Sequence, residues 1–442
     1  MLDWLGILMF AGVFVLLLLG YPVAFTLGGV AVLFSLLGSL LGVFNLALWG
    51  TLPLQVFNTM SNYTLLAIPY FIFMGAMLEK SGIAERLLET IGILFGRVRG
   101  GLALAVIIVG ALLGATTGVV AATVVAMGLI SLPIMLRYGY NKELATGVIV
   151  ASGTLGQIIP PSVVLVVLAD QLGISVGDLF VGAFFPGLLM TGVFALHVFG
   201  ITLIRPDLAP ALPEEVRNLR GRHLMSRILG AMIPPLLLIF LVLGSIFFGF
   251  ATPTEAGALG GIGAILLALI NQRLTWTALR QVCDVTLRIT SMVVLILIGS
   301  TAFSMVFRGL NGEIVMRTFL ANLPGGEWGF LAISMLIVFL LGFFIDFFQI
   351  AFIIVPLFAP VAQSFGLDMV WYGVILGANL QTSFLTPPFG FALFYLRGIA
   401  PDSVKTSEIY RGATQFVLLQ ILVLMAIIRF PGIVTWLPSL AQ

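Results

Sequence analysis

Long apolar runs separated by short polar stretches follow one another along the whole chain. A run of about 20 apolar residues is what a helix needs to cross a bilayer, so the pattern predicts an all-α polytopic membrane protein. The connection over residues 42–62 carries no charge and is expected at the membrane interface. Residues 80–99 and 309–322 mix charge with Leu and Ile at helical spacing, which predicts amphipathic surface helices. Crossing helices are predicted near residues 3–20, 22–41, 64–79, 145–170, 179–204, 228–248, 255–271, 289–306, 370–396 and 412–429.

Two apolar regions do not fit a simple crossing. The pieces 101–113 and 119–135 are short and flank the small, polar segment Gly114–Gly118. They predict a re-entrant helical hairpin over about 101–135, with a single long helix as the alternative. A second hairpin is predicted over about 329–362, with its tip near Phe344–Gln349.

Two crossing helices are interrupted. The stretches ASGTLGQIIPPS (151–162) and ANLQTSFLTPPF (378–389) each run into a Pro-Pro pair within apolar surroundings. Proline donates no backbone N–H and breaks a helix locally. Lipid cannot satisfy the freed carbonyls, so such a break must pack in protein or line a wet cavity. The sequence therefore predicts two broken helices, 145–170 and 370–396, as in secondary transporters.

The two halves of the chain correspond at an offset of 227 residues. Gly and Pro markers recur in the same order, although identity elsewhere is low. The matching pairs are Gly82 and Gly309, Pro133 and Pro360, Gly139 and Gly366, Ala151 and Ala378, and both prolines of each pair. The predicted organisation is a first repeat over 1–204, a cytoplasmic linker over 205–227, a second repeat over 228–430 and a periplasmic tail over 431–442.

The basic residues support this topology. With the N-terminus outside and both hairpins re-entrant, all 20 Lys and Arg lie inside except Arg308, Arg317 and Arg429. Treating 101–135 as one spanning helix would move Arg205–Arg227 outside. Five crossings per half is an odd number, so the repeats are predicted to be inverted, as in elevator-type transporters.

Composition argues against enzymatic chemistry. The chain is 60% hydrophobic and 9% charged, against about 25% charged in globular proteins. Cys283 is the only cysteine, and His197 and His223 are far apart and expected to be structural. Since no cluster of His, Asp or Glu is present, a membrane-embedded enzyme is disfavoured.

Polar residues in apolar surroundings gather at the hairpin tips and helix breaks. For a single Thr or Ser the structural interpretation is a hydrogen bond to the preceding helical turn, and for Asn379 and Gln381 it is a hydrogen bond between helices. Asp346 is weighed towards function, as an ion ligand, a proton carrier or an acceptor that orders the tip. Glu255 fits either a functional role or favourable charge at a helix N-terminus. The candidates are Thr116, Thr117, Gly118, Thr154, Gly156, Gln157, Asp346, Gln349, Asn379, Gln381, Thr382, Ser383 and Thr386.

Several motifs together resemble the large membrane subunit, DctM-like, of the tripartite ATP-independent periplasmic (TRAP) transporters. The resemblance covers essentially the whole chain. It is carried by GATTGVVAATVVAMG, ASGTLGQIIPPS, ATPTEAGALG, FFIDFFQIAFIIVPLFAP and FLTPPFGF.

The resemblance implies a multi-pass subunit of the bacterial inner membrane that imports small organic acids with Na⁺ by an elevator movement. It also implies a periplasmic solute-binding protein that delivers the substrate and a separate small four-helix membrane subunit. The sequences of the first tip and break resemble the subgroup associated with 2-oxo acids, mannitol or chloroaromatic acids more than the sialic acid subgroup, so 2-oxo acids or other carboxylates are expected. A stand-alone sodium- or proton-coupled anion carrier of a related elevator fold is the alternative.

The family's two sodium sites carry over to positions at the two breaks. Val119 and Val120 depart from the Ser-rich first tip of many members, and Ser383 stands where glycine is common. The implied sodium-binding residues are Thr117, Gly156, Ile159 and Pro161 at the first site, and Ser383, Thr386 and Phe389 at the second.

Overall fold

The computed structural model describes residues 4–213 and 222–441, and every regular element within these ranges is a helix. The first half contains α1 (Trp4–Leu18), α2 (Val23–Leu40), η1 (Leu46–Thr51), α3 (Leu52–Met60), α4 (Ala67–Lys80), α5 (Ile83–Leu94), α6 (Gly101–Thr117), α7 (Val120–Arg137), α8 (Lys142–Thr154), η2 (Leu155–Gln157), α9 (Val163–Leu172), α10 (Val176–Ile204) and η3 (Pro206–Leu208). The second half contains α11 (Arg222–Phe247), α12 (Pro253–Ile270), α13 (Trp276–Gly309), α14 (Gly312–Ala321), α15 (Gly326–Leu341), α16 (Phe347–Ile353), α17 (Val355–Ser364), α18 (Met369–Leu385), α19 (Phe391–Ile399), α20 (Thr406–Arg429) and α21 (Gly432–Ala441).

The predicted helices are present, with three differences in extent. α13 starts at Trp276, whereas the sequence predicted a start at 289. The difference arises because the first turns of this helix are polar and a hydropathy pattern does not detect them. The Thr275 side chain caps these turns by accepting a hydrogen bond from Ala278 N. α11 begins at Arg222, within the predicted linker 205–227, of which residues 214–221 lie outside the described ranges. The predicted tail 431–442 forms a helix, α21, which packs on α10.

The helices fit a membrane environment. Seven of those in the described ranges are long and apolar enough to cross a bilayer, or eight if the bent pair α16–α17 counts as one. That pair bends by 52°. α7, predicted to be short, reaches 18 residues and passes the same test. α6 and α7 contact each other and are joined by only Gly118 and Val119, so the two helices form a hairpin.

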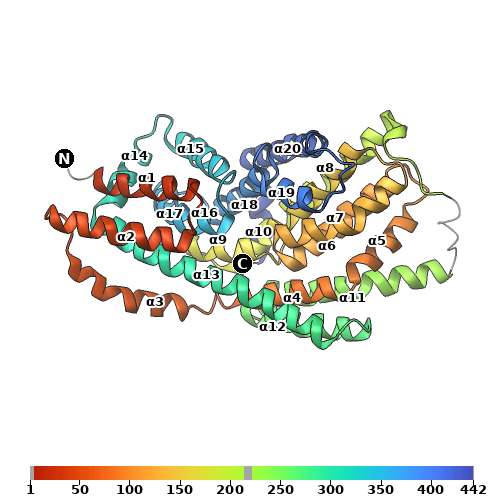
Figure 1. The fold of residues 1–442 in the computed structure, drawn as a ribbon, viewed down its shortest axis with the longest axis horizontal. Coiled ribbons are helices and arrows are strands. Elements are labelled where there is room, and N and C mark those ends of the chain that lie inside the picture. The colour runs from red at the N-terminus through yellow and green to blue at the C-terminus, as the bar shows by residue number, and fades with distance from the viewer. Residues whose placement is uncertain (1–3, 214–221, 442) are drawn as a thin grey trace.

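The two halves of the chain interlock. α2 packs on α13 and α4 on α12, while α7 packs on α19 and α9 on α16 and α17. α8 packs on α20, and α10 on α18. In Figure 1, α1, α2 and α3 lie towards one end of the long axis and α5 and α11 towards the other, with α9, α10 and α18 between them. Neither half is therefore a separate packing unit.

Helix boundaries in the two halves coincide at the offset of 227. α8 begins at Lys142 and α18 at Met369. The preceding residues cap these helices in the same way: Asn141 accepts from Leu144 N, and Asp368 from Trp371 N. In the same register, α7 spans the positions that correspond to α16 and α17 together.

Candidate functional site

The first broken helix ends its regular turns just before the Pro-Pro pair. α8 runs to Thr154 and tightens into η2, and α9 starts at Val163. Between them, the Pro160-Pro161 peptide bond is cis. Ile159 is half-buried and Pro161 is buried, so both predicted ligands lie in the non-helical segment between the two helical pieces. Carbonyls in such a segment lack the helical N–H partner four residues on.

The first hairpin tip lies directly on this break. A methyl group at Gly114 would stand 2.6 Å from the backbone N of Gly156. Gly118 has φ +59°, and a methyl group there would lie 2.8 Å from Val163 N. Only glycine permits this close approach of backbones. The structure thus brings the tip and the break together; the side chains of Thr116 and Thr117 lie outside the described part of the chain, although their backbones complete α6.

The second break has the same arrangement. α18 ends at Leu385, the Pro387-Pro388 bond is cis, and α19 starts at Phe391. A methyl group at Gly342, in the second tip, would lie 2.0 Å from Ser383 Oγ. The ring of Phe344 in this tip packs on that of Phe389, with centroids 4.9 Å apart. One turn earlier, α15 and α18 are joined by a hydrogen bond from Asn379 Nδ2 to Met335 O, 2.7 Å long.

Several hydroxyl groups at the breaks bond to their own helices. Thr154 Oγ1 donates to Ala151 O at 2.9 Å and accepts a hydrogen bond from Gln420 Nε2 at 3.3 Å. Thr382 Oγ1 donates to Ala378 O and Thr386 Oγ1 to Thr382 O. The bonds to the preceding turn are the local kind expected of Thr in apolar helices, and at Thr382 and Thr386 they leave the oxygen lone pairs available to a cation.

Other polar atoms at the breaks have no hydrogen-bond partner within the described part of the chain. Gln157, Gln381 and Ser383 are fully buried, yet both amide atoms of each Gln and Ser383 Oγ make no hydrogen bond among the described residues. Gln349 Oε1 in the second tip is also buried and makes no hydrogen bond among the described residues. A buried polar group without a partner costs about 1–3 kcal/mol. Such groups, gathered at two corresponding places, favour a site that water, an ion or a ligand occupies during function.

Asp346 serves as the N-cap of α16. Its Oδ1 accepts a hydrogen bond from Phe348 N at 3.0 Å, and its backbone is extended. The side chain is half-buried at the tip between α15 and α16. Of the three roles weighed from the sequence, this geometry favours ordering of the tip.

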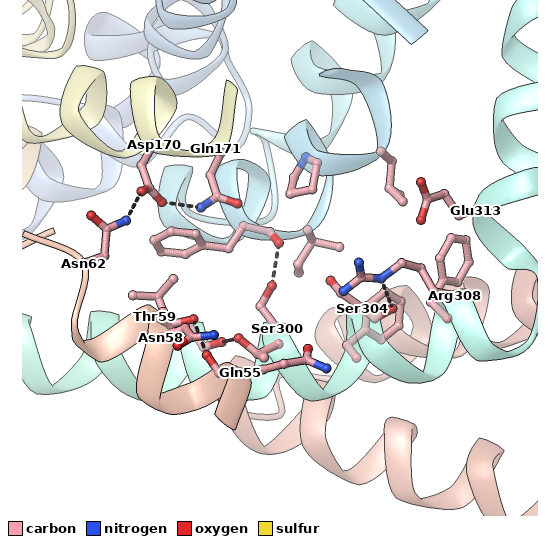
Figure 2. A pocket seen from close by; sticks show the side chains of 18 of the residues that line it. Gln55, Asn58, Thr59, Asn62, Asp170, Gln171, Ser300, Ser304, Arg308 and Glu313 are labelled. Carbon is pink, nitrogen blue, oxygen red and sulfur yellow. Dashed lines mark hydrogen bonds between the residues drawn. The ribbon is translucent and has the colours of Figure 1, made fainter. Parts of the chain in front are cut away.

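A polar cavity that sequence reasoning missed lies beside the second hairpin (Figure 2). Its volume is about 510 Å³. One wall comes from α3 and its following loop with Gln55, Asn58 and Asn62, and from α13 with Ser300, Ser304 and Arg308. The facing wall comes from the end of α9, from α16 and from α17. Because these segments are far apart in the sequence, no local motif marks the cavity.

Hydrogen bonds join the two walls of this cavity. Asn62 donates to one carboxylate oxygen of Asp170, and Gln171 donates to the other, as Figure 2 shows. Ser300 Oγ on α13 donates to Phe352 O on α16 at 2.6 Å. The hairpin and α9 are therefore tied to α3 and α13 in the observed conformation.

Comparison with known proteins agrees with this architecture. The family model "Tripartite ATP-independent periplasmic transporter, DctM component" matches residues 10–433. The C4-dicarboxylate TRAP transporter large permease protein DctM of Pseudomonas aeruginosa is 30% identical, covering 88% of this chain and 89% of its own. The sialic acid TRAP transporter large permease protein SiaM of Vibrio cholerae is 29% identical, covering 99% and 97%. The structure of the YdaH transporter of Alcanivorax borkumensis shares the fold, with a TM-score of 0.59, 15% identity and coverage of 89% and 88%.

An all-helical membrane protein with interrupted helices, similar to permeases over its whole length, is a transport protein and not an enzyme. The chain belongs to the DctM family of TRAP transporter large permeases. It is a multi-pass protein of the bacterial inner membrane.

Proposed function

We propose that this permease drives the import of a small organic acid with an inward sodium gradient. The observation that carries the proposal is the contact of each hairpin tip with a helix break: Gly114 on Gly156, and Gly342 on Ser383. In secondary transporters, unwound carbonyls and half-helix ends of this kind coordinate Na⁺.

Each break supplies oxygen donors for one sodium ion. The first ion would bind carbonyls of Gly156, Ile159 and Pro161 beneath the tip that contains Thr117. The second ion would bind at Ser383, Thr386 and Phe389. The unpartnered, buried Oγ of Ser383 and the short bond from Thr386 Oγ1 to Thr382 O support this assignment, since both hydroxyl oxygens can still accept a cation. The unpartnered amide groups of Gln157 and Gln381 would form hydrogen bonds to the substrate or to water next to the ions.

The two halves act as inverted repeats in this proposal, and the hairpins with the broken helices move as an elevator. Cross-packing supports it, because these contacts have counterparts in the other half: α2 on α13 with α12 on α4, and α7 on α19 with α16–α17 on α9. The shared caps at Asn141 and Asp368 support the same repeat. Helices α2, α4, α12 and α13 would form the static part.

The substrate would be a carboxylate delivered by a periplasmic solute-binding protein, and a small four-helix membrane subunit would brace the static part. The family description calls the transporter tripartite, which supports two partner proteins beside the permease. The relatives named for C4-dicarboxylates and for sialic acid support an organic acid as the substrate class.

Uptake into proteoliposomes tests the proposal. Purified permease with its small subunit, the binding protein and labelled substrate should accumulate label only with sodium higher outside than inside. Equal accumulation with potassium or choline in place of sodium would refute the coupling.

A further inference from the structure

We propose that the polar cavity between α3, α13 and the second hairpin is a carboxylate-binding site anchored by Arg308. It is separate from the two helix breaks, and its ligand is a small organic acid. The inference takes only this substrate class from the proposed function, and it does not depend on sodium coupling.

The cavity is built to receive a polar molecule. A volume of about 510 Å³ falls in the range of small-molecule sites, about 300–1,000 Å³. Its floor and walls present amide and hydroxyl groups from α3, α9 and α13, including Gln55, Asn58, Thr59 and Ser304. Such groups both donate and accept hydrogen bonds, which suits the carboxylate and hydroxyl oxygens of organic acids.

Arg308 is the cationic residue that lines this cavity. Its Nε donates to Ser304 O at 3.3 Å, which fixes the guanidinium near the end of α13. Its terminal nitrogens make no hydrogen bond or ion pair to any residue that the structure describes, and Figure 2 shows the group at one end of the cavity. A guanidinium with a free edge matches a carboxylate in bidentate geometry.

Two carboxylates, Asp170 and Glu313, also line the cavity and affect its affinity for an anion. Asp170 accepts from Asn62 and Gln171, so both of its oxygens are already engaged by amide donors. Glu313 lies beside Arg308 at the same end, without an ion pair between them among the described residues (Figure 2). Glu313 therefore opposes anion binding by charge repulsion, and its removal should strengthen binding.

A cysteine-protection experiment tests the site without knowledge of the natural substrate. Full-length permease in lipid nanodiscs carries Cys283→Ser to remove the exposed native thiol and Ser304→Cys as a reporter. Iodoacetamide labels the reporter in sodium-free buffer. Succinate, pyruvate and N-acetylneuraminate are added separately as probes, and succinamide serves as the uncharged control. Thr59→Cys provides a second reporter if the first variant does not fold.

We expect at least one of the acids to slow labelling fivefold or more, while succinamide does not. In Arg308→Gln the concentration needed for protection should rise at least tenfold, and in Glu313→Gln it should fall. Arg317→Gln is the matched control, because Arg317 is likewise an exposed arginine, on the neighbouring helix α14, and does not line the cavity. Protection that is equal with succinamide, or unchanged in Arg308→Gln, would overturn the proposal. Since no sodium is present, this result is independent of the outcome of the sodium-gradient experiment.

Discussion

The Cα of Gly342 and the side chain of Ser383 are in direct contact, so that a methyl group at Gly342 would lie 2.0 Å from Ser383 Oγ and 2.9 Å from Ser383 Cβ. This contact places the second hairpin tip on the second helix break. In the first half, two glycines, Gly114 and Gly156, occupy the corresponding contact. In this contact the second break therefore carries the hydroxyl of Ser383, where the first break has Gly156.

Gly342→Ala is expected to lower the free energy of unfolding by about 1–3 kcal/mol, because the added methyl overpacks the tip. Ser383→Gly in the same chain should restore most of this loss, since it removes both clashing atoms. Thermal unfolding of the single and double variants in nanodiscs measures the coupling. Gly192→Ala is the control, because a methyl group there meets no atom within 4 Å. Simple additivity of the two single effects would contradict the contact.

Thr386→Ala is expected to raise the sodium concentration for half-maximal uptake about tenfold, equivalent to about 1.4 kcal/mol of ion binding. The reason is the loss of one hydroxyl ligand at the second break. Thr414→Ala is a matched control, since Thr414 makes the same bond to its own helix, to Tyr410 O, on an exposed face of α20. If both variants show the same sodium dependence as the unaltered protein, Thr386 is not a ligand.

Asp346→Asn should retain uptake within about twofold, because an asparagine oxygen caps a helix as well as an aspartate oxygen does. Asp346→Ala should destabilise the protein by about 1 kcal/mol through loss of the cap on α16. Uptake and thermal unfolding of the pair are the measurements. Loss of uptake in Asp346→Asn with unchanged stability would instead assign the carboxylate to ion binding or proton transfer.

Glu255 belongs to a capping box at the start of α12. Thr252 Oγ1 accepts from Glu255 N, and the Glu255 carboxylate accepts from Thr252 N at 2.8 Å. Of the two interpretations open from the sequence, a functional role or favourable charge at a helix N-terminus, the structure favours the second, and it adds hydrogen bonds that cap the helix. Glu255→Gln should leave uptake and stability nearly unchanged, because glutamine fits the same box, whereas Thr252→Ala should cost about 1 kcal/mol. A large loss of sodium-driven uptake in Glu255→Gln would indicate a functional role.

The features that the sequence predicted well are those with a local chemical cause. The Pro-Pro breaks follow from the missing N–H of proline, and the tip at Gly118 follows from the small residues between two apolar pieces. α21 was missed because residues 431–442 are few and contain Pro438, and its order comes from packing on α10, where Trp436 contacts Phe185.

The cavity could not be predicted because its residues have no shared local pattern. Gln55, Asp170, Ser300 and Arg308 are brought together only by the cross-packing of the halves. Arg308 was visible in the sequence merely as one of the few basic residues assigned outside. Its position beside the cavity depends on how α13 packs on α14 and α16, which hydropathy does not encode.

The central claim is that an inward sodium gradient drives uptake of an organic acid through this permease, with the binding protein as donor. The most direct measurement is accumulation of labelled substrate in proteoliposomes, with the sodium gradient and the binding protein each present or omitted. We predict accumulation only when both are present, and its collapse when sodium is equalised across the membrane. Accumulation from free substrate without the binding protein, or at an undiminished rate without the sodium gradient, would contradict the account.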